Sequence, residues 1–151
     1  QNKYFYDVSP KSVLAYKGNS RGSAWFDFDN DGDIDCAIND YHGPGRIFEN
    51  TQKLGNRWVR LELEGTAANR NAVGARVEIQ YGNAAHPQRR FSQVVSGKGF
   101  ISQDPMALHF GLGGHDKVSR AIITWPGGKK QTLENLAAGQ VHRIKQPAAA
   151  E

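Results

Sequence analysis

Short runs of alternating apolar and polar residues follow one another along this chain. Val59, Leu61 and Leu63 alternate with charged residues, and Val77 and Ile79 do so in a second run. A period of two is what a strand with one buried face requires, and no long stretch repeats with the helical period. Residues typical of turns interrupt the pattern about every ten residues. The pattern therefore predicts an all-β protein built from short strands.

The expected strands fall into two groups separated by a polar, Gly-containing segment, residues 51–56, which we interpret as a linker. We expect a first domain over residues 1–52 that contains one antiparallel sheet shaped like a propeller blade. A second domain over 57–146 is expected to be a small β-sandwich or barrel, and residues 147–151 a frayed tail. The expected strands cover residues 4–8, 23–28, 34–38, 46–50, 59–63, 75–81, 91–96, 108–112 and 121–125, and a final strand contains Val141 and Ile144.

Charge is distributed unevenly along the chain. The formal net charge is +4, but five Asp residues between positions 27 and 35 contribute −5, so the rest of the chain sums to +9. The Lys and Arg residues occur singly or in pairs, such as Arg89-Arg90, which is typical of a solvated surface rather than a nucleic-acid site. We therefore expect no nucleic-acid partner.

Several features bear on the compartment. No apolar run approaches the roughly 18 residues of a membrane helix, so membrane insertion is not expected. The single cysteine, Cys36, excludes an internal disulfide framework, and its place on the apolar face of a strand predicts a buried hydrophobe. A chain that begins at Gln1 would fit a mature secreted product, so an extracellular location is expected.

The acidic residues are concentrated in one loop between two predicted strands. Asp27, Asp29, Asp31, Asp33 and Asp35 occupy every second position, and Gly32 allows the chain to turn. Carboxylates packed so closely repel one another unless a cation lies between them. Oxygen ligands in this number suit Ca²⁺ better than Mg²⁺ and do not suit soft metals. The spacing predicts a calcium site.

The ligand arrangement differs from that of an EF-hand. An EF-hand needs a bidentate Glu at loop position 12 and a helix on each side, whereas position 12 counted from Asp27 is Ile38 and both flanks are strand-like. We expect side-chain ligands from Asp27, Asp29, Asp31 and Asp35, and the backbone carbonyl of Asp33. Because no His and no open ligand position is evident, the ion is interpreted as structural.

Longer motifs surround these residues. The run from Phe5 to Asn50, including DFDNDGDID, resembles an FG-GAP/VCBS repeat, the blade unit of β-propellers in integrin α-chains and many secreted proteins. The segments RWVRLELEG, NRNAVGARVEI, GKGFISQ, LHFGLGG and ITWPGGKKQTLENL resemble an ASPIC/UnbV domain, which follows such repeats in secreted proteins of the cartilage acidic protein type. In that family the loop holds Ca²⁺, which the resemblance carries over to Asp27, Asp29, Asp31, Asp33 and Asp35. A propeller needs about four to eight blades, whereas this chain has room for one.

Catalytic motifs are not evident. The five His residues are dispersed, no Gly-x-Ser-x-Gly elbow is present, and Glu62, Glu64 and Glu78 fall on exposed strand faces. We expect a calcium-stabilised extracellular structural protein, not an enzyme, that assembles with copies of itself through exposed β edges or through a strand donated by residues 2–9.

Two alternatives remain open at this stage. One is a monomeric adhesion module that binds carbohydrate or protein through Trp25, Trp58, Trp125 and the Tyr41-His42 loop. The other is a fragment of a larger propeller, in which further blades would cover the exposed edges.

Overall fold

The computed structural model describes residues 4–83 and 85–148, and all its regular elements except one 3₁₀ turn are strands. The all-β prediction is therefore confirmed. The chain separates into two compact units, and each is described by itself: unit 1 comprises Gln1–Thr51 with Gly99–Asp104, and unit 2 comprises Gln52–Lys98 with Pro105–Glu151. The sequence assigned residues 99–104 to the second domain, whereas these residues contact the first.

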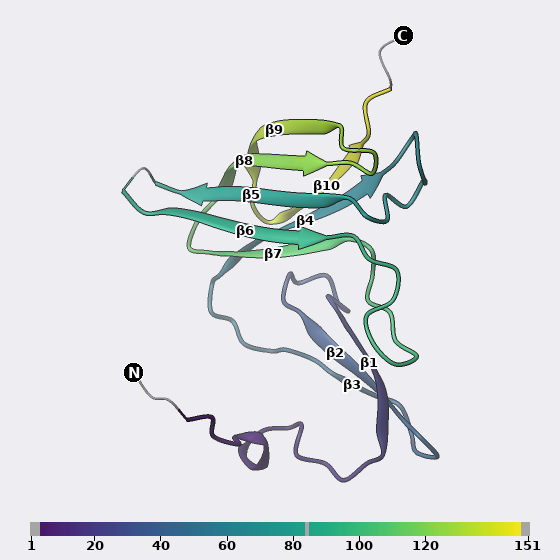
Figure 1. Cartoon of the computed structure of the whole chain (residues 1–151). Coiled ribbons are helices and arrows are strands. Elements are labelled where there is room, and N and C mark those ends of the chain that lie inside the picture. The colour runs from purple at the N-terminus through teal and green to yellow at the C-terminus, as the bar shows by residue number, and fades with distance from the viewer. Residues whose placement is uncertain (1–3, 84, 149–151) are drawn as a thin grey trace. The chain divides into compact units, whose positions relative to one another are not determined.

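Unit 1 contains a three-stranded antiparallel sheet in the order β1-β2-β3 (Figure 1). The strands are β1 (Ser20–Phe26), β2 (Asp35–Asp40) and β3 (Arg46–Phe48). Cys36 is 4% exposed, and it is the only buried apolar side chain among the described residues of this unit. The prediction of a buried cysteine is confirmed, and burial raises the pKa of its thiol. Unit 1 therefore has almost no hydrophobic core of its own.

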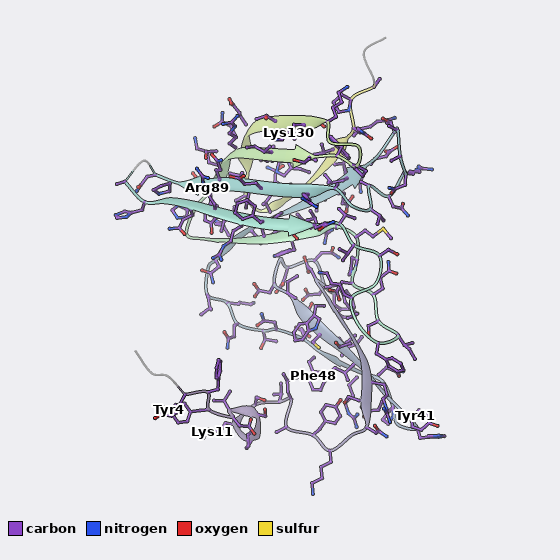
Figure 2. All side chains as sticks on the ribbon, in the orientation of Figure 1. Tyr4, Lys11, Tyr41, Phe48, Arg89 and Lys130 are labelled. Atoms are coloured by element: carbon purple, nitrogen blue, oxygen red, sulfur yellow. The ribbon has the colours of Figure 1, made fainter. Side chains whose placement is uncertain are left out.

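The predicted N-terminal strand is wrong for residues 4–8. These residues form no strand, and they lead into the 3₁₀ turn η1 (Ser9–Lys11), which has Pro10 within it. Phe5 is fully exposed and Tyr4 is 77% exposed. Figure 2 labels Tyr4. An apolar run alone does not make a strand, because a strand needs a neighbour for its backbone hydrogen bonds. Residues 2 and 3 of the predicted donated segment lie outside the described residues.

The outer edge of β1 is covered by side chains of the segment 99–104. The Ser23 N–H donates to Ser102 Oγ at 3.1 Å, and the Trp25 N–H donates to Asp104 Oδ1 at 2.8 Å. Alternate backbone groups of an edge strand point away from the sheet and would otherwise be available to another strand. β3 is the other edge strand of this sheet, and no described strand pairs with its outer edge.

Unit 2 is a sandwich of two sheets (Figure 1). One sheet has the order β10-β4-β7, from β4 (Arg57–Glu64), β7 (Leu108–Gly113) and β10 (Gln140–Lys145), with β10 parallel to β4. The other has the order β6-β5-β8-β9, from β5 (Arg76–Gly82), β6 (Pro87–Gln93), β8 (Lys117–Thr124) and β9 (Lys130–Ala137). The core between them includes fully buried Val59, Leu61, Ile79, Ile123 and Trp125.

Within unit 2, β4, β5 and β7 lie close to their predicted positions. β6 and β8 each begin four residues before the predicted strand, and β9 was not predicted. The predicted final strand corresponds to β10, after which the buried Gln146 accepts hydrogen bonds from the Thr66 and Ala67 N–H groups. Of the predicted tail, Pro147 and Ala148 are exposed, and residues 149–151 lie outside the described residues. No helix in the described part of the chain is long and apolar enough to cross a membrane.

Candidate metal centre

The acidic loop connects β1 to β2, and the pairing of these strands brings its two ends together. Phe26, the last residue of β1, pairs with Asp35, the first residue of β2. Asp27 and Asp35 therefore flank the same point of the sheet, although they are eight positions apart in the sequence. The antiparallel hairpin thus closes the loop on itself, which is the first requirement for a site built from one short segment.

Asp35 fixes the base of this loop. Its side chain is 2% exposed, and its two carboxylate oxygens accept hydrogen bonds from the backbone N–H groups of Phe28, at 2.7 Å, and Asn50, at 2.8 Å. The carboxylate therefore connects the start of the loop to the segment that follows β3. Such charge-assisted hydrogen bonds hold a carboxylate in one orientation, so Asp35 is a positioned group rather than a mobile surface acid.

The middle of the loop is curled by local hydrogen bonds. Asp29 Oδ1 accepts from the Asp31 N–H at 3.2 Å, and Asp31 Oδ1 accepts from the Asp33 N–H at 2.9 Å. Asn30 and Gly32 have φ angles of 64° and 95°, the left-handed region that Gly and Asn adopt most readily. The alternation of Asp with turn-forming residues thus produces a tight coil instead of a third extended segment.

Three of the five acidic side chains converge. Asp27, Asp29 and Asp35 each offer one carboxylate oxygen, and these three oxygens lie within 4.8 Å of one another. Ligands bound to one Ca²⁺ at about 2.4 Å can lie at most about 4.8 Å apart, so the separation permits a shared ion. The donor set consists of hard oxygen atoms, and it fits Ca²⁺ by the chemistry of its ligands.

The other two predicted ligands are placed differently. Asp31 is exposed and lies outside the converging group, with its carboxylate engaged by the Asp33 N–H. Asp33 is predicted to contribute its backbone carbonyl. It precedes by two residues Asp35, whose side chain is held by two backbone N–H groups. Among the described residues, no other group of three His, Cys, Asp or Glu side chains converges in this way.

A second charged cluster, which was not predicted, lies at the opposite end of β2. Asp40 is 6% exposed, and its carboxylate accepts hydrogen bonds from Ser20, at 2.8 Å, from Tyr16, at 3.2 Å, and from Arg46. Burial by itself raises the pKa of Asp40, but these hydrogen bonds and the positive charge of Arg46 outweigh that effect and lower it. The Arg46 guanidinium also lies 4.1 Å from the centre of the Tyr16 ring. Because both oxygens of Asp40 have partners, this cluster is a structural ion pair.

The aromatic residues considered for ligand binding have different environments. Trp125 is 1% exposed and donates its indole N–H to Gln131 Oε1 at 3.0 Å, so it belongs to the core. Trp58 is half-buried and stacks on His109 with ring centres 5.7 Å apart. Trp25 and Tyr41 remain exposed, at 49% and 60%. Of the aromatic residues predicted to bind a ligand, the exposed ones therefore lie in unit 1, where Figure 2 labels Tyr41.

Comparison with known proteins finds a family match that covers most of unit 2. The family model described as ASPIC and UnbV matches residues 65–151. A curated relative, Cartilage acidic protein 1 of Xenopus tropicalis, is 30% identical over 146 residues, covering 93% of this chain and 21% of its own length. The chain thus spans about one fifth of the length of that relative, and the match extends across both units.

Proposed function

Because the chain belongs to the ASPIC and UnbV family, we propose that it is an extracellular structural protein without enzymatic activity. In this proposal Ca²⁺ bound by the acidic loop stabilises unit 1, and the protein assembles with copies of itself. The relative that matches 93% of this chain carries a name that refers to cartilage, which supports a matrix-type role. A calcium-rich compartment outside the cell would keep such a loop loaded.

The convergence of Asp27, Asp29 and Asp35 is the observation that carries the calcium proposal. It occurs in a unit whose described residues include only one buried apolar side chain, Cys36. A hydrophobic core is the usual source of stability for a domain, so unit 1 needs another contribution. Binding of Ca²⁺ only to the folded loop would supply about 3 kcal/mol at a hundredfold excess over the dissociation constant.

The variant Asp29→Asn tests this proposal with little disturbance of the fold, since Asp29 is exposed and an Asn oxygen can still accept the Asp31 N–H. Calorimetric titration should detect Ca²⁺ binding to the native protein and binding at least about tenfold weaker in the variant. Asp116→Asn, which removes an exposed carboxylate from unit 2, should bind as the native protein does. Equal affinity in Asp29→Asn, or the absence of binding in the native protein, would contradict the calcium site.

Assembly is supported by the uncovered edge of β3 and by the exposed apolar residues near the N-terminus. Tyr4, Phe5, Tyr6 and Val8 are all more than two thirds exposed. In an isolated chain these side chains gain nothing from burial, whereas an added strand would bury them and complete the backbone hydrogen bonds of an edge. We propose that the segment 2–9 of one copy adds to the β3 edge of another copy.

Substitutions at Tyr6 test strand donation directly. Tyr6→Pro removes one backbone N–H and restricts φ, so it should abolish assembly, while Tyr6→Thr keeps a residue that strands accept and should preserve it. Light scattering and negative-stain images in Ca²⁺ provide the measurement. If the native protein remains monomeric at all concentrations, the self-assembly proposal fails, and the exposed Trp25 and Tyr41 then favour the adhesion module.

A further inference from the structure

The two units differ strongly in formal charge. Unit 1 has five Lys and Arg against nine Asp and Glu, a charge of −4, whereas unit 2 has fourteen against six, a charge of +8. A positive charge of this size on about two thirds of the chain attracts anions and raises their rate of association. The question is whether the positive side chains gather on one surface of unit 2.

Four of them lie on the outer face of the sheet β6-β5-β8-β9, which we call the cationic face. Because Val77 and Ile79 of β5 are buried in the core, Arg76, Glu78 and Gln80 point outward. Gln80 pairs with Arg89 of β6 on one side and with Arg120 of β8 on the other. Arg76 pairs with Thr124 of β8, and Thr124 in turn pairs with Lys130 of β9. All four cationic residues, Arg76, Arg89, Arg120 and Lys130, are exposed. Two acids share the face: Glu78 of β5, and the exposed Glu134 of β9, which the register places beside Arg120.

The spacing of these cations restricts the ligand. Arg76 and Lys130 are two strands apart, as are Arg89 and Arg120, which separates each pair by roughly 10 Å at the backbone. The two pairs lie four residues apart along β5, or roughly 13 Å. One small anion cannot bridge such distances. The cations therefore suit a polymer that carries several separate anionic groups.

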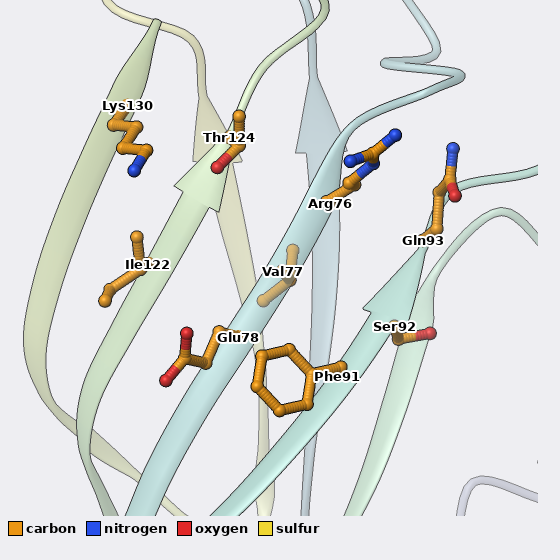
Figure 3. A pocket seen from close by; sticks show the side chains of 9 residues that line it. All are labelled: Arg76, Val77, Glu78, Phe91, Ser92, Gln93, Ile122, Thr124 and Lys130. Atoms are coloured by element: carbon orange, nitrogen blue, oxygen red, sulfur yellow. The ribbon is translucent and has the colours of Figure 1, made fainter. Parts of the chain in front are cut away.

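Between the two pairs lies a row that is not cationic. Phe91, Glu78 and Ile122 are neighbours across β6, β5 and β8, and Phe91 is 70% exposed. Figure 3 shows the Phe91 ring beside Glu78, with Arg76 and Lys130 farther along the same face. The face is hollowed here by a groove of about 500 Å³, lined in part by these five residues. The carboxylate of Glu78 accepts from Gln80 at 2.9 Å and lies 3.7 Å from Arg89.

The central row favours one class of polymer. Glu78 would repel an anionic group placed directly over it, so the ligand needs charges at the ends and a neutral segment at the centre. A sugar ring presents C–H groups to an aromatic ring and hydroxyls to a carboxylate, whereas a nucleic acid carries a charge on every nucleotide and gains most from several stacking rings. An extended acidic peptide would pair with a strand edge rather than with the face of a sheet.

We propose that the cationic face binds a linear anionic polysaccharide, one in which sulfate or carboxylate groups alternate with neutral positions along the chain. The guanidinium groups of Arg76, Arg89 and Arg120 suit bidentate contacts with sulfate or carboxylate oxygens. Phe91 packs against the neutral sugar ring between them. This activity does not depend on the calcium site or on assembly, since every residue of the cationic face belongs to unit 2.

Surface plasmon resonance on immobilised heparin and chondroitin sulfate tests the proposal with the full chain, in Ca²⁺ and again in chelator. Binding should be present in both conditions and should weaken as the salt concentration rises. Arg76→Gln with Arg120→Gln should weaken it by about tenfold or more, and Phe91→Ser should also weaken it. The control is Arg143→Gln with Lys145→Gln, which also removes two positive charges, from exposed positions of β10. It should leave binding close to native.

Four results would overturn the proposal. The first is that the native protein binds neither polysaccharide. The second is that the two double variants lose binding equally, which would indicate nonspecific attraction. The third is that soluble poly-glutamate competes better than either polysaccharide, which would identify an acidic-peptide site. The fourth is that a single-stranded oligonucleotide competes better than all of them, which would identify a nucleic-acid binding site.

Discussion

Asp35 and Asp29 are both acids of the same loop, but their side chains have different roles. Asp35 accepts two backbone N–H groups while nearly fully buried, whereas Asp29 is exposed. In Asp35→Asn the amide NH₂ would face one of these N–H donors, which costs about 1–3 kcal/mol even without metal. We therefore expect Asp35→Asn to lower the thermal midpoint of unit 1 in both Ca²⁺ and chelator, and Asp29→Asn to lower it only in Ca²⁺. Identical behaviour of the two variants in chelator would contradict this division of roles.

The ion pair of Asp40 and Arg46 makes unit 1 sensitive to acid. Since the pKa of Asp40 is lower in the folded state than its ordinary value of 3.8, its stabilising effect is complete above that value and is lost as the pH falls through the folded pKa. The difference in thermal midpoint between the native protein and Asp40→Asn should therefore be constant at neutral pH and shrink below about pH 4. Both proteins should be measured at saturating Ca²⁺, so that the loop carboxylates affect them alike. A difference that does not change between pH 7 and pH 2 would contradict this account.

At the acidic loop, the sequence predicted that carboxylates cluster but not which groups hold each side chain. The alternation of Asp in the loop predicted an acidic cluster, and the structure brings Asp27, Asp29 and Asp35 together. The backbone bonds of Asp35 and the partners of Asp40 join residues that are distant in the chain, such as Asn50 and Tyr16. Such hydrogen bonds leave no periodic pattern in a sequence. The Asp40 and Arg46 pair flanks a Gly-Pro-Gly turn, and this turn is the only local signal in the sequence that the two charges meet.

Among the elements, the strands with one clearly buried face were the predictable ones. In β5 the buried positions alternate strictly with partly exposed ones, and the predicted and observed strands nearly coincide. In β6 nearly every residue is exposed, so the period of two has no hydrophobic signal and the predicted position was displaced. In β9 the inward positions include the polar Gln131, which Trp125 requires as a hydrogen-bond partner. The positions of β6 and β9 therefore depend on contacts with the rest of unit 2 rather than on a hydrophobic pattern within each strand.

The covered edge of β1 leads to a prediction about association. Ser102→Ala with Asp104→Ala would leave the Ser23 and Trp25 N–H groups without these acceptors and open the edge to another strand. We expect the double variant to associate at lower concentrations than the native protein and to lose about 1–3 kcal/mol of stability from two hydrogen bonds. Sedimentation velocity measures the first effect and thermal unfolding the second. Gln103→Ala, at the exposed position between them, should behave as the native protein does, and the same association in this control would contradict the capping role.

For the whole molecule, stability is expected to have two separate sources. The cluster of buried apolar residues lies entirely in unit 2, while the described part of unit 1 contributes only Cys36 to the buried apolar side chains. The hydrophobic effect therefore stabilises unit 2 directly. Unit 1 depends on hydrogen bonds, on the Asp40 ion pair and, in our proposal, on Ca²⁺.

Differential scanning calorimetry should consequently resolve two transitions. Chelation of Ca²⁺ should move the lower transition, that of unit 1, to lower temperature and leave the upper one in place. Ile79→Ala, a truncation in the core of unit 2, should cost about 2–5 kcal/mol and move only the upper transition, while Asp29→Asn should move only the lower one. Hydrogen exchange assigns each transition, since exchange in β2 should accelerate in chelator and exchange in β5 should not. One transition that responds to all three changes would show that the two units unfold together, and it would contradict a stabilising effect of Ca²⁺ confined to unit 1.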